Sequence, residues 1–235
     1  MSERKIEKVI IALDGMNESE VFIFLKKVSS HFAYVKVGME LYYQHGPTIV
    51  QKIYNEFGLK VFLDLKLHDI PNTVSSSIKS LKNLPVHFLT VHISGGYEML
   101  IQAKESAKTY LPQTKLLGVG LLTSLNPQDL NRIWGIDESR WNESFSRLID
   151  LCEQATIDGL ILSPHELTLA KNRKLIKICP GIRFSDEIAK QNTQDQKRVG
   201  TPESAIKDGA DFLVMGRSLT KSTNLDQRVL ELTHL

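Results

Sequence analysis

Residues 60–66 read Lys60-Val-Phe-Leu-Asp-Leu-Lys66, an apolar run with charged residues at both ends and one inside it. Side chains alternate between the two faces of a β-strand, so Phe62, Asp64 and Lys66 share one face and Leu63 and Leu65 share the other. The wholly apolar face is typical of a strand covered by helices, as in a parallel sheet. The stretch therefore predicts a buried parallel strand that turns its charged residues away from the helices.

Further apolar runs of similar length flank this one, and helix-length stretches separate them. This alternation is typical of a parallel sheet with helices packed outside it. Because no Gly-, Pro- or Ser-rich linker divides the chain, eight such units favour a single α/β domain over residues 1–235, a (β/α)8 TIM barrel, rather than an open doubly wound sheet. A Gly-x-Gly-x-x-Gly dinucleotide fingerprint does not follow the first run. The expected strands are Val9–Leu13, Tyr34–Gly38, Lys60–Lys66, His87–Ile93, Leu116–Leu122, Gly159–Leu162, Leu175–Cys179 and Phe212–Met215.

Three helix starts can be placed from the sequence. Asn126-Pro127, Ser163-Pro164 and Thr201-Pro202 each put a capping side chain directly before a proline at the first helical position. Glu166 follows Ser163 at the spacing of a capping box. These pairs predict helices that begin at residues 127, 164 and 202.

The composition excludes several functional classes. The chain has 235 residues, a net charge of +2 and 42% hydrophobic residues, which is ordinary for a globular protein. A net charge so near zero gives no basic footprint for nucleic acid. The apolar runs are far shorter than the ~20 residues of a membrane span, and no signal-peptide core follows the charged segment Met1–Lys8. We expect a cytoplasmic protein that binds neither nucleic acid nor membrane.

Charged residues follow or end several of the expected strands. A barrel builds its active site at the carboxyl ends of its strands, and Asp14, Lys36, Asp64, Lys66 and Asp69 fall there. One such residue alone would be an ordinary solvated charge. Two lysines with two or three carboxylates are different, because packed charges cost desolvation free energy and are seldom retained for stability alone. We predict that they belong to one active site, in which Lys36, Asp64, Lys66 and Asp69 are the candidate catalytic residues.

A second group of polar residues follows the last two expected strands. Gly181-Ile182-Arg183 and Gly216-Arg217-Ser218 each offer backbone N–H groups beside an arginine. In this fold the corresponding loops often bind phosphate. We favour a phosphate site over the alternative of two surface arginines.

The segment Phe184–Arg198 is long, polar and rich in Gln, Asn and Asp. Structureless loops of this length are uncommon in compact domains and often act as active-site lids. We expect such a lid here, with a disordered surface excursion as the alternative.

Metal sites have little support in the sequence. The seven histidines include no His-Glu-x-x-His motif, and Cys152 and Cys179 match no metal or redox spacing. Asp64 and Asp69 could hold Mg²⁺, but Lys66 between them and Lys36 nearby would repel the cation. We expect no metal.

Residues 64–73, Asp64-Leu-Lys-Leu-His-Asp-Ile-Pro-Asn-Thr73, resemble the signature segment of the orotidine 5′-phosphate decarboxylase family. The similarity spans nearly the whole chain. Two features depart from the family pattern: Ile93 stands where alanine is more usual, and Arg183 and Gln196 are unusually far apart. Further segments that match in order are Ile11–Asp14, Val35–Leu41, Val91–Gly96, Leu122–Ser124, Pro180–Arg183, Asp195–Arg198, Thr201-Pro202 and Val214–Arg217.

This resemblance implies decarboxylation of orotidine 5′-monophosphate to UMP and CO₂, the last step of de novo pyrimidine nucleotide biosynthesis, without metal or organic cofactor. It implies that Lys66 stabilises and protonates a carbanion at C6 of the pyrimidine. It also implies a homodimer with shared active sites, in which Lys36, Asp64 and Lys66 of one subunit meet Asp69 of the other. Pro71 prevents a helix from starting before it, so residues 67–70 are free to turn outward across a dimer interface.

The substrate-binding residues implied by the resemblance extend beyond this catalytic set. Asp14 and Lys36 would bind ribose hydroxyls, and Ile70 and Thr73 would reach in from the partner subunit. The remaining residues would flank the pyrimidine (Thr123, Pro180) or hold the phosphate (Arg183, Gln196, Gly216, Arg217).

Two alternatives remain at this point. A Mg²⁺-dependent decarboxylase of the keto-gulonate phosphate type shares the Asp-x-Lys-x-x-Asp pattern, but it carries a carboxylate at the position of Lys36 and lacks the Ile-Pro-Asn-Thr continuation. A non-catalytic barrel that binds a phosphorylated metabolite could keep Arg183 and Arg217 but would not need the Lys–Asp cluster. Lys36 therefore discriminates against the first alternative, and the cluster against the second.

Overall fold

The computed structural model describes residues 6–189 and 198–235, and within these ranges the strands close into a parallel barrel in sequence order. Val9, Ile10 and Ile11 of the first strand pair with Leu213–Met215 of the last. All the expected strands are confirmed, with ends that differ by a few residues. They are β1 (Ile6–Ala12), β2 (Phe32–Gly38), β3 (Lys60–Leu67), β4 (Val86–His92), β5 (Lys115–Val119), β6 (Gly159–Ile161), β7 (Ile176–Cys179) and β8 (Phe212–Met215).

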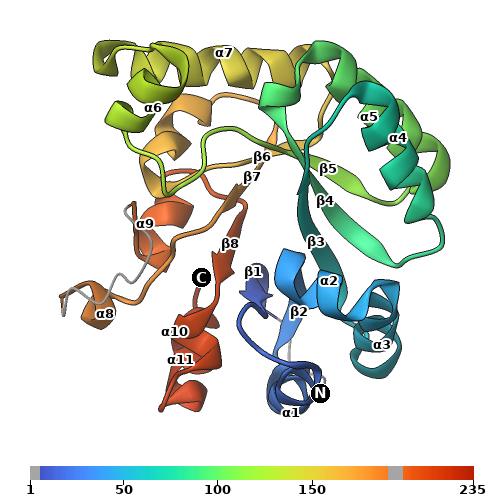
Figure 1. Ribbon diagram of the computed structural model, residues 1–235. Coiled ribbons are helices and arrows are strands. Elements are labelled where there is room, and N and C mark those ends of the chain that lie inside the picture. Colours follow the sequence, from blue (N-terminus) through green and yellow to red (C-terminus); the bar gives the residue numbers. More distant parts are fainter. Residues whose placement is uncertain (1–5, 190–197) are drawn as a thin grey trace.

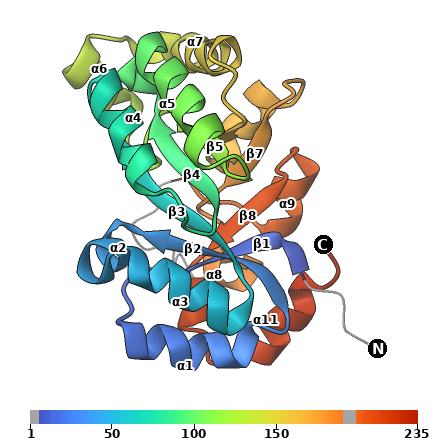
Figure 2. The same cartoon turned by 90° about the vertical axis from the view of Figure 1, so that its right-hand side faces the viewer.

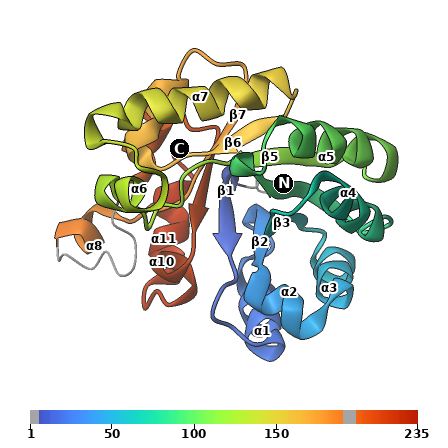
Figure 3. The same cartoon turned by 45° about the horizontal axis from the view of Figure 1, so that its top comes forward.

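Helices surround the barrel (Figure 1), which confirms the (β/α)8 architecture. The helices that follow β3 and β4 pack side by side (Figure 2). A tilted view shows the helices outside the strands (Figure 3). The α-helices are α1 (Glu18–Val28), α2 (Met39–His45), α3 (Pro47–Phe57), α4 (Pro71–Ser80), α5 (Tyr97–Tyr110), α6 (Pro127–Trp134), α7 (Trp141–Gln154), α8 (Ser185–Ala189), α9 (Pro202–Lys207), α10 (Arg217–Thr220) and α11 (Leu225–Leu232). The short 3₁₀ helices are η1 (Ile93–Gly95), η2 (Glu138–Arg140) and η3 (Pro164–Ala170). No helix within the described ranges is long and apolar enough to cross a membrane.

The three predicted helix starts are confirmed. Asn126 caps α6 and Thr201 caps α9, each through its side-chain oxygen and a backbone N–H three residues on. At Ser163 the backbone N–H donates to the Glu166 carboxylate at 2.8 Å. The helix that begins there is 3₁₀ rather than α.

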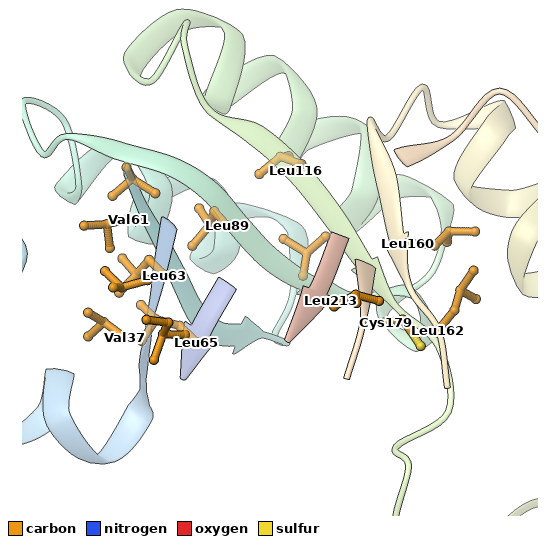
Figure 4. Packing of buried hydrophobic residues seen from close by; sticks show 14 of the residues in the cluster. Val37, Val61, Leu63, Leu65, Leu89, Leu116, Leu160, Leu162, Cys179 and Leu213 are labelled. Atoms are coloured by element: carbon orange, nitrogen blue, oxygen red, sulfur yellow. The ribbon is translucent and has the colours of Figure 1, made fainter. Parts of the chain in front are cut away.

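The hydrophobic residues form two clusters, one between strands and helices and a smaller one inside the barrel. Leu63 and Leu65 of β3 belong to the outer cluster, where they lie beside Val37 of β2 (Figure 4). Phe62 belongs to the inner cluster, together with residues such as Tyr34. The orientation inferred for the two faces of residues 60–66 is therefore confirmed.

The strand β3 carries an irregularity directly below its carboxyl end. Leu63 pairs with Leu89 of β4 and Leu67 pairs with Val91, so β3 uses more residues than β4 between the two pairings. Such a bulge bends a strand and redirects its side chains. Lys66 lies within it and adopts a φ of 49°, a left-handed conformation that residues other than glycine rarely take.

The expectation of a structureless segment from Phe184 to Arg198 is wrong for its first part, which forms α8. The Phe184 N–H donates to the Glu187 carboxylate at 2.9 Å, and acidic side chains in a first turn stabilise a helix. Arg228 of α11 adds two hydrogen bonds of 2.8 Å to Asp186 and stacks on Phe184. Residues 190–197 lie outside the described residues, so the rest of the lid prediction stays untested.

Candidate active site

A cavity of about 490 Å³ opens at the carboxyl ends of the strands. Most of the residues predicted for the site line it, and they come from both ends of the chain. They are Asp14, Lys36, Asp64, Lys66, Thr123, Pro180, Arg183, Gly216 and Arg217. Ala12, Phe62 and Val214 of the inner apolar cluster also line the cavity, so they form an apolar floor below the charged residues.

The lysines and carboxylates alternate across the mouth of the barrel. The Lys36 Nζ donates to both carboxylate oxygens of Asp14, at 2.9 and 2.8 Å, and lies 3.5 Å from Asp64 Oδ2. The Lys66 Nζ donates to Asp64 Oδ2 at 2.8 Å. Asp64 is thus bracketed by two ammonium groups, and the expectation that Asp64 and Lys66 point into the mouth is confirmed.

The surroundings of Asp64 favour its ionised form. Burial of this carboxyl by itself raises its pKa. The charges of Lys36 and Lys66, together with hydrogen bonds from Lys66 and Thr90, outweigh burial and hold the pKa below its ordinary value. The site therefore keeps a buried negative charge beside an ammonium group at neutral pH.

Two residues next to these charged groups were missed in the sequence. Thr90 of β4 is fully buried, and its hydroxyl donates to Asp64 Oδ1 at 2.9 Å. Gly38 ends β2 in register with Asp64. A Cβ at Gly38 would lie 2.3 Å from Asp14 Oδ1 and 3.2 Å from Lys36 Nζ. The missing side chain therefore leaves the space in which the Asp14 carboxylate sits.

The loop after β1 has a further support. The Gly15 N–H donates to the Glu40 carboxylate at 3.1 Å, which ties this loop to α2. Glu40 lies in the segment Val35–Leu41 that resembles the family, although the resemblance assigned it no role.

Two arginines follow β7 and β8, the strands that precede β1 in the closed barrel, and so flank the Lys–Asp array of β1–β3 on one side. Arg183 follows β7 and is 5% exposed, and its Nη1 donates to the Ile182 carbonyl at 2.8 Å. Arg217 follows β8, and Lys221 from the end of α10 also lines the cavity. Lys221 was not predicted from the sequence. This end of the cavity is therefore cationic, whereas Gln196 lies outside the described residues.

A buried ion pair holds the loop after β5 in place. Arg198 binds the Glu166 carboxylate, donates to the Leu122 carbonyl at 2.9 Å and lies over the Trp141 ring. Leu122 and Thr123 line the cavity. Arg198 thus connects the end of the segment after β7 with the loop that carries Thr123.

Asp69, Ile70 and Thr73 are absent from the lining of the cavity. The Asp69 carboxylate accepts the Ile70 N–H at 2.7 Å, and Ile70 is 66% exposed. The following helix α4 begins at Pro71, as expected. These residues therefore do not line the cavity of their own chain.

Possible metal ligands do not gather within residues 6–189 and 198–235: no group of three or more His, Cys, Asp and Glu side chains could hold an ion there. In the mouth of the barrel, ammonium groups occupy the positions between the carboxylates.

A closed barrel with a Lys–Asp array at its strand ends defines the class of the protein, a (β/α)8-barrel enzyme. The chain belongs to the family described as "Orotidine 5'-phosphate decarboxylase / HUMPS family", whose profile matches residues 7–232. It is 41% identical over 231 residues to an orotidine 5′-phosphate decarboxylase of Dictyoglomus thermophilum, covering 94% of this chain and 91% of that one. It is 38% identical over 238 residues to the enzyme of that name in Malacoplasma penetrans, covering 100% and 99%.

Solved structures agree with this assignment. A crystal structure of orotidine 5′-phosphate decarboxylase from Lactobacillus acidophilus is similar, with a TM-score of 0.77, 33% identity, and coverage of 96% of this chain and 97% of that one. An uncharacterized conserved protein from Geobacillus kaustophilus gives a TM-score of 0.81 at 33% identity, covering 96% and 98%.

Proposed function

We propose that this protein is a carboxy-lyase that converts orotidine 5′-monophosphate to UMP and CO₂. The family description names two activities, and the relatives reported above carry the decarboxylase name. The observation that carries the choice is Lys36, whose ammonium group lies between Asp14 and Asp64. The Mg²⁺-dependent alternative needs a carboxylate at this position.

The array suits the chemistry of this decarboxylation. Loss of CO₂ from C6 leaves a carbanion with no conjugated electron sink, so a fixed positive charge must stabilise it. The Lys66 ammonium, held 2.8 Å from Asp64, can supply that charge and then deliver a proton to C6. An ionised Asp64 beside the substrate carboxylate repels it, and this repulsion is relieved as CO₂ departs.

Substrate binding is assigned to the rest of the cavity. Arg183, Arg217 and the backbone of Gly216 are positioned to hold the phosphate, since arginine pairs well with a phosphate dianion. Thr123 and Pro180 flank the pyrimidine. Phosphate contacts far from C6 supply binding free energy that can accelerate the chemical step at C6. Asp14 and Lys36 are assigned to the ribose hydroxyls, and Gln196 is assigned to the phosphate together with the arginines.

A decarboxylation assay tests the function directly. The purified protein should consume orotidine 5′-monophosphate, followed by the loss of its absorbance, and Lys66→Ala should abolish turnover while leaving the thermal unfolding midpoint near that of wild type. Exhaustive chelation should leave the rate unchanged, because ammonium groups already neutralise the carboxylates.

Each alternative has its own signature in this experiment. A rate that chelation removes and Mg²⁺ restores indicates the keto-gulonate phosphate type. Binding of UMP without any turnover indicates a non-catalytic barrel.

The active protein is a homodimer in which each site takes Asp69, Ile70 and Thr73 from the partner. Support comes from Ile70, which is an exposed apolar side chain directly after Asp69. Met39 and Tyr97, at 41% and 44% exposure, begin α2 and α5, the helices that follow β2 and β4 on either side of β3. Large apolar side chains exposed after three adjacent strands are typical of a protein interface.

Mixed dimers test this sharing. Lys66→Ala and Asp69→Ala homodimers should both be nearly inactive, whereas a mixed dimer has one site with both lesions and one intact site. Random exchange of equal amounts should recover roughly a quarter of wild-type activity. Exchange is verified independently with two differently tagged chains. No recovery under verified exchange means that Asp69 serves its own chain.

Two further assignments belong to this proposal. The chain forms one domain over residues 1–235, since β1 and β8 close a single barrel. A cytoplasmic location is supported by Cys152 and Cys179, which are both buried free thiols.

A further inference from the structure

Thr90 contacts two residues of the Lys–Asp array without lining the cavity. It lies on β4, its side chain is fully buried, and it is not among the residues that surround the cavity. Its Oγ1 accepts the backbone N–H of Lys66 at 2.9 Å and donates to Asp64 Oδ1 at 2.9 Å. One hydroxyl thus joins the backbone of one residue to the carboxylate of the other.

The directions of these two hydrogen bonds are fixed by chemistry. A backbone N–H can only donate, so the hydroxyl must accept from Lys66, and its single proton is left for Asp64. The Asp64 carboxylate then accepts one hydrogen bond from the Thr90 hydroxyl at Oδ1 and one from the Lys66 ammonium at Oδ2. Hydrogen bonds that form a chain in this way strengthen one another.

The backbone of Lys66 needs such a support. Lys66 lies where the pairing of β3 and β4 is interrupted, between Leu63 and Leu67. Its φ of 49° is a left-handed conformation that costs free energy for a residue with a side chain. Strained conformations persist only where the surrounding structure holds them. The Thr90 hydroxyl satisfies the Lys66 N–H at the point where the strand ladder fails.

We propose that Thr90 is a positioning residue, which holds the Lys66 backbone in its strained conformation and orients the Asp64 carboxylate toward the Lys66 ammonium. This inference rests on the proposed function only in treating Lys66 and Asp64 as the catalytic pair. The threonine is fully buried and does not line the cavity, so we expect no contact between it and the substrate.

Removal of the hydroxyl has two consequences. The Lys66 N–H and Asp64 Oδ1 each lose a buried partner, so the strained backbone can relax and move the ammonium group. The pKa of Asp64 also rises, because burial raises it and the Thr90 hydrogen bond is one of the interactions that lower it.

That removal neither adds nor deletes a charged group around Asp64. Lys36 of β2 and Lys66 of β3 face it directly, and Asp14 lies behind Lys36. On β4, burial lowers the pKa of His92, with His68 and Lys66 adding to that effect. Arg183, Arg217 and Lys221 line the same cavity, and Asp69 is expected from the partner subunit. A change in Asp64 titration is therefore assigned to the lost hydroxyl and to the Lys66 ammonium that it positions.

The experiment compares Thr90→Val, which has the same shape without the hydroxyl, with Thr90→Ser, which keeps it. Thr114→Val is the matched control, because Thr114 is also buried and donates one hydrogen bond, of 2.7 Å, to the Val86 carbonyl. We expect kcat of Thr90→Val to fall about 10- to 100-fold with little change in KM, as for loss of a hydrogen bond to a charged group. Thr90→Ser and Thr114→Val should stay within about threefold of wild type.

A second readout does not depend on turnover. Carbon-detected NMR follows the Asp64 carboxyl, assigned by the signal that Asp64→Asn removes. In Thr90→Val this carboxyl should titrate at higher pH than in wild type, and the acid limb of kcat should move the same way; Thr90→Ser and Thr114→Val should show neither shift. Should the valine variant not fold, Thr90→Cys replaces it, because a thiol is a weak donor and acceptor.

The outcomes separate this proposal from the function itself. An inactive wild type refutes the proposed function, while the Asp64 titration still tests Thr90. If Thr90→Val has the same kcat as wild type and its Asp64 carboxyl titrates at the same pH, the proposed role of Thr90 is wrong. The role is also wrong if Thr114→Val shows an equal loss of kcat, since that result indicates only a loss of stability.

Discussion

Gly38→Ala is a single-methyl change that should damage the site without unfolding the barrel. The new Cβ would lie 2.3 Å from Asp14 Oδ1, whereas ordinary contacts between carbon and oxygen are longer by about 1 Å. The Asp14 carboxylate must therefore move by about 1 Å, and this breaks at least one of its two hydrogen bonds with Lys36. Misplacement of a binding or catalytic group by about 1 Å costs up to about 100-fold in rate.

The assay measures kcat/KM for orotidine 5′-monophosphate in a double-mutant cycle of Gly38→Ala and Asp14→Ala. In the wild-type background we expect Gly38→Ala to lower kcat/KM about 10- to 100-fold. In the Asp14→Ala background the carboxylate that the methyl group strikes is gone, so the same change should cost less than about threefold. Thermal unfolding of every variant checks that the fold is intact.

The non-additivity is the decisive quantity. If Gly38→Ala lowers kcat/KM by the same factor in both backgrounds, the methyl group does not act through Asp14 and the steric argument is wrong. An unchanged kcat/KM in the wild-type background also refutes it, because the carboxylate would then have another place to sit.

Three other changes have expected outcomes. Arg217→Ala should lower kcat/KM for the nucleotide at least about 10-fold but hardly change it for the phosphate-free nucleoside; equal losses would make Arg217 structural. Burial lowers the pKa of His87 below 6.5, so the unfolded state binds more protons than the folded state. The free energy of unfolding should therefore fall as the pH drops below 6.5, and it should fall less steeply in His87→Gln. The same dependence of unfolding free energy on pH in both proteins would contradict this. Arg198→Leu should lower the free energy of unfolding, measured by urea denaturation, by about 3 kcal/mol, because Glu166 stays buried without its partner. Adding Glu166→Gln should restore part of this loss. If it restores nothing, the loss comes from the packing of Arg198 on Trp141 instead.

Much of the fold follows from three short-range regularities in the sequence. The alternation of apolar runs with helix-length segments predicted every strand of the barrel, and the two-residue period of Lys60–Lys66 predicted which side chains enter its mouth. Proline after a capping residue placed three helix starts, as at Asn126. These features depend only on residues close together in the chain, so one sequence suffices to find them.

The residues that were missed depend on pairs of distant segments. Thr90 lies below the end of its strand, and only the position of β3 beside it shows that its hydroxyl reaches Asp64. Gly38 matters because the Asp14 carboxylate occupies the space of its side chain. The short helix α8 depends on Arg228, far along the chain. Register, close approach and long-range ion pairs are properties of the folded chain, which local patterns do not contain.

Pairing between β1 and β8 has a consequence for synthesis of the chain. Asp14 emerges from the ribosome early and Arg217 late, yet both line one cavity. Until β8 is made, β1 and β7 remain open sheet edges, which are templates for pairing with other chains. Non-local closure of this kind is slow, so the nascent protein is most prone to aggregation just before its last strand is added. Activity in a translation reaction should therefore not appear before this final seam has closed.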